Sequence, residues 1–119
     1  MHSSDDIEAL IIKTIEGAGG DGLNFEMSKR VSGESFLTPP GYLSDLVGSA
    51  AEAETGVTCE LSTTGGTSDS RFIKDFCPVL DFGLVGKTMH QVDERVAVSD
   101  IVTLTNIYGR IIAGYFKAP

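Results

Sequence analysis

Apolar residues recur at three- and four-residue intervals in three stretches of the chain, residues 4–16, 42–55 and 99–116. This spacing places them on one side of a helix, so it predicts three helices, each with an apolar face. Ser4 is the expected cap of the first helix and the Ser99-Asp100 pair that of the last. The apolar faces comprise Ile7, Leu10, Ile11 and Ile15; Tyr42, Leu46, Ala50 and Ala53; and Ile101, Leu104, Ile107 or Tyr108, Ile111 and Tyr115.

Three other stretches have the pattern of strands. Apolar and polar residues alternate over residues 22–29, and residues 57–61 form a short apolar run. Residues 77–85 are almost continuously apolar, which is typical of an interior strand in a parallel sheet. The order of elements predicts an α/β chain in which residues 57–61 and 77–85 share a sheet that the last helix covers. The Pro39-Pro40 pair marks a crossing between two structural units.

Composition narrows the class of protein. The chain has 119 residues and a formal net charge of −8. This charge argues against a nucleic-acid partner and against a polybasic membrane patch, and no apolar run is long enough to span a bilayer. Two cysteines do not make a disulfide framework, so a cytoplasmic location is expected.

A glycine-rich loop with the sequence GGTSD lies between a predicted strand and a short helix expected over residues 69–73. Glycines let a ligand approach the backbone closely, and free N–H groups attract anions. Arg71 follows the loop and could pair with a carboxylate. The alternative is an ordinary strand-to-helix turn, and the spacing of the glycines is not that of a P-loop.

His90 lies in a second polar loop, followed by Asp93 and Glu94. A histidine with nearby acids could be a metal ligand with its hydrogen-bond partner, or a general base with an orienting carboxylate. The alternative is an ordinary surface histidine. One histidine and dispersed acids do not by themselves form a recognisable metal site.

At these two loops, LSTTGGTSDSRFIKDF and TMHQVDERV, the sequence resembles the desuccinylase branch of the dizinc aminoacylase and carboxypeptidase family. The stretch SGESFLTPPG supports the same resemblance. It implies a zinc-peptidase-like catalytic domain with an inserted α+β lid that mediates dimerisation. Residues 1–34 are then the remnant of the lid and residues 35–119 the C-terminal part of the catalytic domain. The chain is expected to correspond to about the last third of such an enzyme.

The resemblance also implies an activity, the hydrolysis of N-succinyl-LL-2,6-diaminopimelate to succinate and diaminopimelate in lysine biosynthesis. Family members hold two zinc ions, and the late histidine ligand matches His90, with Asp93 and Glu94 as candidate partners. Gly66 and Thr67 match the loop that receives the succinyl carboxylate, with Arg71 close by. A pocket that holds both the acyl carboxylate and the metal requires Gly66 and His90 to lie on the same edge of the sheet.

The chain departs from the family pattern because the other zinc ligands and the general base have no counterpart in it. We therefore expect no catalytic residue in this chain, no zinc bound by it alone and no activity in isolation. The expected partners of the whole enzyme are a small-molecule substrate and a second copy. The alternatives are a related deacylase or carboxypeptidase of the same family, or a non-catalytic interaction module.

Overall fold

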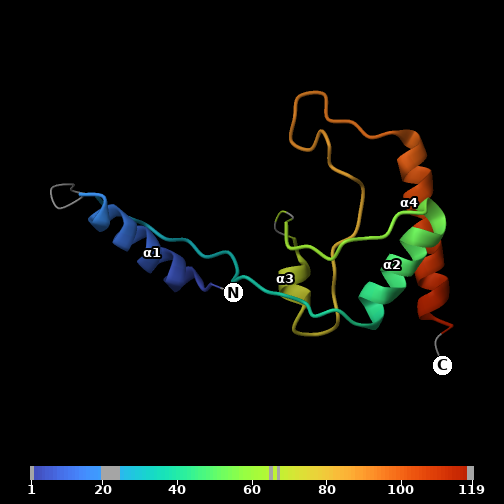
Figure 1. Cartoon of the computed structure of the whole chain (residues 1–119), viewed down its shortest axis with the longest axis horizontal. Helices are drawn as coiled ribbons and strands as arrows, with labels where there is room; N and C mark the ends of the chain where they lie inside the picture. The colour runs from blue at the N-terminus through green and yellow to red at the C-terminus, as the bar shows by residue number, and fades with distance from the viewer. Residues whose placement is uncertain (1, 20–24, 65, 67, 118–119) are drawn as a thin grey trace. The chain divides into compact units, whose positions relative to one another are not determined.

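A computed structural model describes residues 2–19, 25–64, 66 and 68–117. The chain divides into two compact units, Met1–Leu37 and Thr38–Pro119. The described residues form one helix in the first unit and three in the second (Figure 1). Their bounds are Ser4–Gly17 for α1, Tyr42–Thr55 for α2, Ser70–Ile73 for α3 and Val98–Tyr115 for α4.

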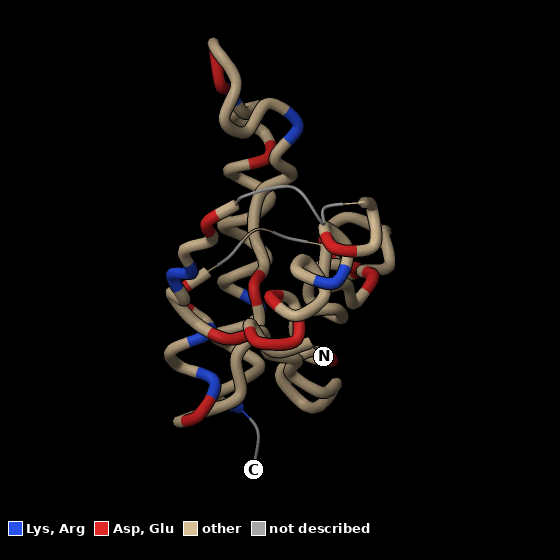
Figure 2. Tube along the Cα trace, turned by 90° about the vertical axis from the view of Figure 1, so that its left-hand side faces the viewer, with Lys and Arg blue, Asp and Glu red and all other residues tan. Residues whose placement is uncertain are grey.

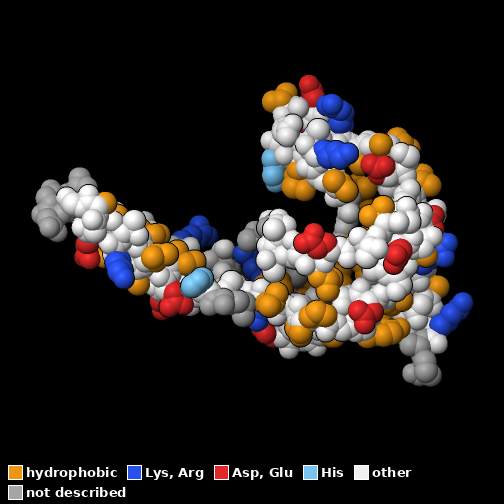
Figure 3. All heavy atoms as spheres, in the orientation of Figure 1, with side chains coloured by type: hydrophobic (Ala, Val, Ile, Leu, Met, Phe, Trp, Pro, Cys, Tyr) orange, Lys and Arg blue, Asp and Glu red, His pale blue; other side chains and the backbone are white. Residues whose placement is uncertain are grey.

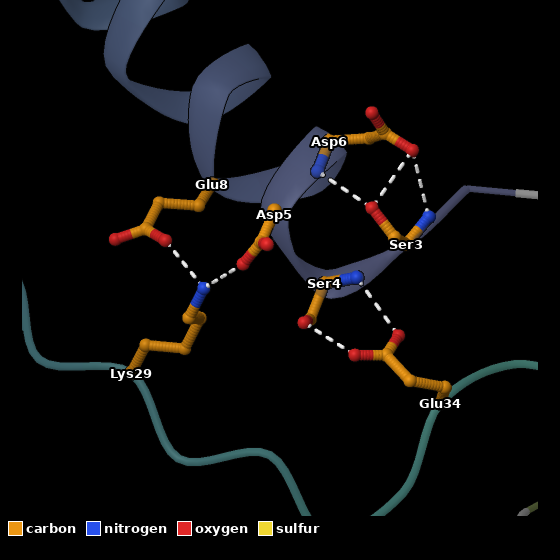
Figure 4. A network of polar contacts seen from close by, with 7 residues as sticks. All are labelled: Ser3, Ser4, Asp5, Asp6, Glu8, Lys29 and Glu34. Atoms are coloured by element: carbon orange, nitrogen blue, oxygen red, sulfur yellow. Dashed lines mark hydrogen bonds and ion pairs between the residues drawn. The ribbon is translucent and has the colours of Figure 1, made fainter.

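In the first unit, α1 is capped one residue earlier than the sequence predicts. The Ser3 hydroxyl accepts a hydrogen bond from the Asp6 N–H at 3.1 Å, and the Asp6 carboxylate accepts one from the Ser3 N–H at 2.8 Å (Figure 4). This reciprocal pair is a capping box. The hydrogen bond from the Ser3 backbone lowers the pKa of the Asp6 carboxyl. Ser4 was the wrong candidate because it bonds Glu34 instead, through its N–H and its hydroxyl.

The segment that returns along α1 is held by charge. The Lys29 ammonium contacts the carboxylates of Asp5 and Glu8, and the hydrogen bond to Asp5 is the main cause of the raised pKa of Lys29 (Figure 4). Residues 25–29 are irregular in the structure, and residues 22–24 of the predicted strand lie outside the described residues. The apolar face of α1 forms as predicted, but it is largely exposed, with Leu10 at 62%.

In the second unit, α2 packs against α4. Ala50 and Ala51 of α2 and Ile107 of α4 form a buried cluster, and Phe82 and Ile111 pack against it. The small alanine side chains let the two helices approach closely. The bounds of α2 agree with the sequence prediction, and Gly56 ends the helix in the left-handed conformation at a φ of 71°.

The start of α4 differs from the prediction. The helix begins at Val98 after Ala97, and no side chain caps it, so Ser99 and Asp100 lie inside the first turn. Asp100 there still faces the positive end of the helix dipole. Ile107 is the buried position of the helix, whereas Tyr115, which was predicted to face the core, is 53% exposed.

A polar contact links the same two helices. The Glu54 carboxylate accepts hydrogen bonds from the Asn106 amide at 2.8 Å and from the Arg110 guanidinium at 2.9 Å. The bond from Asn106, followed by that from Arg110, lowers the pKa of the Glu54 carboxyl below its ordinary value of 4.5. The charged form of Glu54 therefore stabilises the helix pair.

This contact predicts a pH dependence of stability. Because the folded pKa of Glu54 is depressed, its contribution is complete above the ordinary value of 4.5 and is lost as the pH falls through the folded pKa. We expect the difference in free energy of unfolding between the chain and the Glu54→Gln variant to be constant near pH 7 and to shrink in acid. Urea unfolding at several pH values measures it. Glu60→Gln, at an exposed position, is the control, and a parallel loss in both comparisons would contradict the assignment.

None of the predicted strands forms where the structure describes the chain. Residues 57–61 and 77–85 are irregular, and none of the residues that the structure describes forms a strand, so the α/β class is not confirmed. The physical reason is that a strand needs a hydrogen-bonding neighbour. Without one, apolar side chains of these segments remain outside, with Val57 64% and Leu61 61% exposed. The last helix accordingly packs on α2 instead of covering a sheet.

Both units carry exposed apolar side chains and acidic residues. Apolar side chains lie on the face drawn in Figure 3, and Asp and Glu are spread along the trace in Figure 2. Phe76 at 87% and Val92 at 92% are the extreme cases in the second unit. Among the helices that the structure describes, none is long and apolar enough to cross a bilayer.

Candidate functional site

The glycine-rich loop has an open side. Gly66 is exposed, and a Cβ atom built on it meets no atom within 4 Å apart from those of its two neighbours in the chain. A ligand can therefore approach the backbone at this position. Thr67, the second residue predicted to receive the succinyl carboxylate, lies outside the described residues.

The loop is tied to the segment that follows α3. The Asp81 carboxylate accepts hydrogen bonds from the hydroxyls of Ser68 and Ser70, each at 2.9 Å. The Ser68 hydroxyl in turn accepts the N–H of Ser70 at 3.1 Å. Ser70 is 7% exposed, so this is the buried end of the loop. The backbone around residues 68–70 is thus fixed by three hydrogen bonds.

Arg71 is the second residue of α3. Its side chain is half-buried, and the guanidinium carbon lies 4.7 Å from the centroid of the Phe72 ring. This stacking orients the planar cation. The role of Arg71 beside a substrate carboxylate stays a prediction.

The loop with His90 is closed by a reciprocal contact. The Thr88 hydroxyl donates to the Arg95 carbonyl at 2.8 Å and accepts from the Arg95 N–H at 3.0 Å. Inside the loop, His90 and Asp93 have φ values of 62° and 61°, in the left-handed region that side-chain-bearing residues rarely adopt. Such conformations cost about 1–3 kcal/mol each. The loop therefore holds His90 in a defined backbone conformation.

The structure brings Glu94 to His90, but to its main chain. The His90 N–H donates to the Glu94 carboxylate at 3.4 Å, and the carbonyl of Asp93 accepts from the Arg95 guanidinium at 3.3 Å. The predicted partnership of Asp93 or Glu94 with the imidazole, and the convergence of Gly66 and His90 on one pocket, stay predictions. Within the described ranges, no three His, Cys, Asp or Glu side chains form a group that could hold a metal ion.

Comparison with known proteins assigns the chain to a family. A sequence model described as peptidase family M20/M25/M40 matches residues 4–114. The chain belongs to this family. Its match covers nearly the whole chain and includes both the glycine loop and the loop of His90. The family assignment agrees with the resemblance on which the sequence prediction depended.

Relatives within this family carry a more specific name. The succinyl-diaminopimelate desuccinylase of Ruegeria pomeroyi is 66% identical over 95 residues, which are 80% of this chain and 25% of the relative. That of Rhodospirillum rubrum is 51% identical over 119 residues, 99% of this chain and 30% of the relative. That of Rhodospirillum centenum is 53% identical over 116 residues. The chain thus spans between a quarter and a third of the length of these curated relatives.

Sequence reasoning missed Asp81. It appears in the printed sequence as a single acid inside the apolar run of residues 77–85, which suggested only a strand. The serines that it binds are 13 and 11 residues earlier in the chain. The available signal was a single carboxylate in an otherwise apolar segment. If such a segment is buried, the charge of the carboxylate needs hydrogen-bond partners.

Proposed function

We propose that this chain is part of a metal-dependent amide hydrolase of the desuccinylase type. The whole enzyme hydrolyses N-succinyl-LL-2,6-diaminopimelate to succinate and diaminopimelate. The observation that carries the proposal is the 66% identity to a desuccinylase over 80% of the chain, a share that takes in the glycine loop. In this proposal the chain supplies one part of the substrate site and one metal ligand.

The glycine loop binds the acyl end of the substrate. A succinyl group differs from other acyl groups by its free carboxylate, which needs N–H donors or a cation. The backbone at Gly66 and Thr67 supplies donors, and the Arg71 guanidinium supplies the charge. The open side of Gly66 supports this role because the carboxylate can reach the backbone there. Binding at this remote end positions the amide bond for hydrolysis.

His90 is the proposed metal ligand of this chain, with Asp93 or Glu94 orienting the ring. Zinc in catalytic sites takes three protein ligands, and the described residues contain no such group. The residues present therefore do not fit a complete zinc site, and the other ligands and the general base belong to the remainder of the enzyme. What this chain does in the reaction is limited to holding substrate and supplying His90.

The organisation of the whole enzyme follows the family resemblance. Residues 1–34 belong to the lid, through which two copies associate, and residues 35–119 form the C-terminal part of the catalytic domain. The chain corresponds to about the last third of the enzyme. Cys59 and Cys77 are both free and exposed, which suits a reducing compartment, so we place the enzyme in the cytoplasm.

A chimera tests the proposed activity. The 95 matched residues of this chain replace their counterparts in the Ruegeria pomeroyi desuccinylase. We expect the chimera to release succinate from N-succinyl-diaminopimelate and to have at least about a hundredfold lower kcat/KM for N-acetyl amino acids and dipeptides, because only the succinyl group offers a carboxylate to the loop. Preference for an acetylated or peptide substrate would favour a related deacylase or carboxypeptidase instead.

A further inference from the structure

Asp81 stands at the junction of the glycine loop and the helical core of the second unit. Its two carboxylate oxygens are each used on a different serine, Oδ2 on the Ser68 hydroxyl and Oδ1 on the Ser70 hydroxyl. Hydrogen bonds to a carboxylate are about twice as strong as those between neutral groups. A single side chain thus fixes both ends of the three-residue stretch that joins the loop to α3.

The residue after Asp81 is anchored on the core. The Phe82 side chain packs against the cluster of Ala50, Ala51 and Ile107. The Tyr108 hydroxyl of α4 donates to the Phe82 carbonyl at 2.7 Å, and the two rings meet edge to face at 6.3 Å. Asp81 therefore connects the loop to a part of the backbone that α4 holds in place.

The same contacts restrict what the serines can do. A serine hydroxyl has one proton to donate, and both Ser68 and Ser70 donate theirs to Asp81. Neither hydroxyl is left as a donor for the carboxylate of a substrate. The hydroxyls of Ser68 and Ser70 therefore stabilise the conformation of the loop. In the proposed function, the substrate carboxylate is bound by the backbone of the loop and by Arg71.

We propose that Asp81 is a positioning residue for substrate binding. It holds residues 68–70, which lead from the glycine loop into α3, so that the loop can receive the succinyl carboxylate, without touching the substrate itself. This inference rests on the proposed function, because it concerns the same loop. It predicts that the affinity for succinate depends on an exposed carboxylate that binds Ser68 and Ser70 and carries the same charge as the ligand.

The test uses the chimera with Asp81→Ala, Asp81→Asn and Asp75→Ala. Asp75 is an exposed acid in the same region that pairs with Lys74, so its removal is the matched control for the loss of one negative charge. We expect Asp81→Ala to raise the inhibition constant of succinate and the KM of the succinyl substrate together by about tenfold, the effect of losing charge-assisted hydrogen bonds. Asparagine keeps one oxygen acceptor and should give a smaller increase, while Asp75→Ala should change neither constant.

The outcomes separate this inference from the proposed function. If the unmodified chimera cleaves the succinyl substrate but Asp81→Ala leaves the succinate inhibition constant unchanged, the positioning role is wrong and the function stands. If Asp81→Ala lowers only thermal stability or kcat, Asp81 is merely structural and the inference is again overturned. If unmodified chimeras in both the Ruegeria pomeroyi and the Rhodospirillum rubrum enzymes fold but release no succinate, the proposed function fails, and this inference with it.

Discussion

The isolated 119-residue chain is expected to release no succinate from N-succinyl-diaminopimelate, with or without added zinc. Hydrolysis at a zinc centre requires several protein ligands and a base positioned on the attacking water. The described residues gather no group of three metal-binding side chains, and His90 is exposed. Losing a metal centre and a general base together lowers the rate of hydrolysis by many orders of magnitude. We therefore expect the rate with the chain to equal the uncatalysed rate in buffer.

Enzyme-coupled detection of succinate over several hours measures this, with the chimera at the same concentration as the positive control. Zinc-dependent turnover by the purified chain, removed by a chelator and by His90→Ala, would contradict the account. It would mean that the chain or a second copy of it completes the site.

Replacing Ile107 by alanine is expected to unfold the helix pair of the second unit. Ile107 is 4% exposed and lies against Ala50 and Ala51. Among the residues that the structure describes, Val47 is the only other buried apolar side chain. Truncating a buried isoleucine to alanine costs about 2–5 kcal/mol. A core of this size supplies little more than that, since even ordinary domains are stable by only about 5–15 kcal/mol.

Ile112→Ala is the matched control, because it makes the same change on the same helix at a position that is 57% exposed. Both variants gain the same helix propensity from alanine. Circular dichroism at 222 nm and urea unfolding of the full chain should therefore show a large loss for Ile107→Ala and almost none for Ile112→Ala. Equal effects of the two substitutions would show that α4 does not pack through Ile107.

The helices were predictable because their signals are local. The bounds of α2 follow from the three- and four-residue spacing of its apolar residues and from the two glycines that flank it. Gly41 and Gly56 are the residues at which the helix begins and ends. Capping was harder to predict, because Ser3 and Ser4 are equally good caps by residue type. The choice between them depends on Glu34, which is 30 residues from Ser4 in the sequence. Its carboxylate accepts hydrogen bonds from the N–H and the hydroxyl of Ser4.

The strands could not be predicted from the sequence alone because pairing is not a local property. Residues 77–85 have the composition of an interior strand, yet a strand exists only where a neighbour completes its ladder. The hydrogen bonds from Ser68 and Ser70 to Asp81 could not be predicted for a similar reason. Ser68, Ser70 and Asp81 are unremarkable polar residues until the chain folds back and brings the carboxylate to both hydroxyls.

The central claim is that the loop of residues 66–71 receives a free carboxylate on the acyl group. The most direct measurement is the ratio of kcat/KM for N-succinyl- to N-butyryl-diaminopimelate in the chimera, since the two acyl groups have similar length and differ in the carboxylate. The account predicts a ratio of at least about 100, the value of two charge-assisted hydrogen bonds that only one substrate can make. A ratio near one would contradict it.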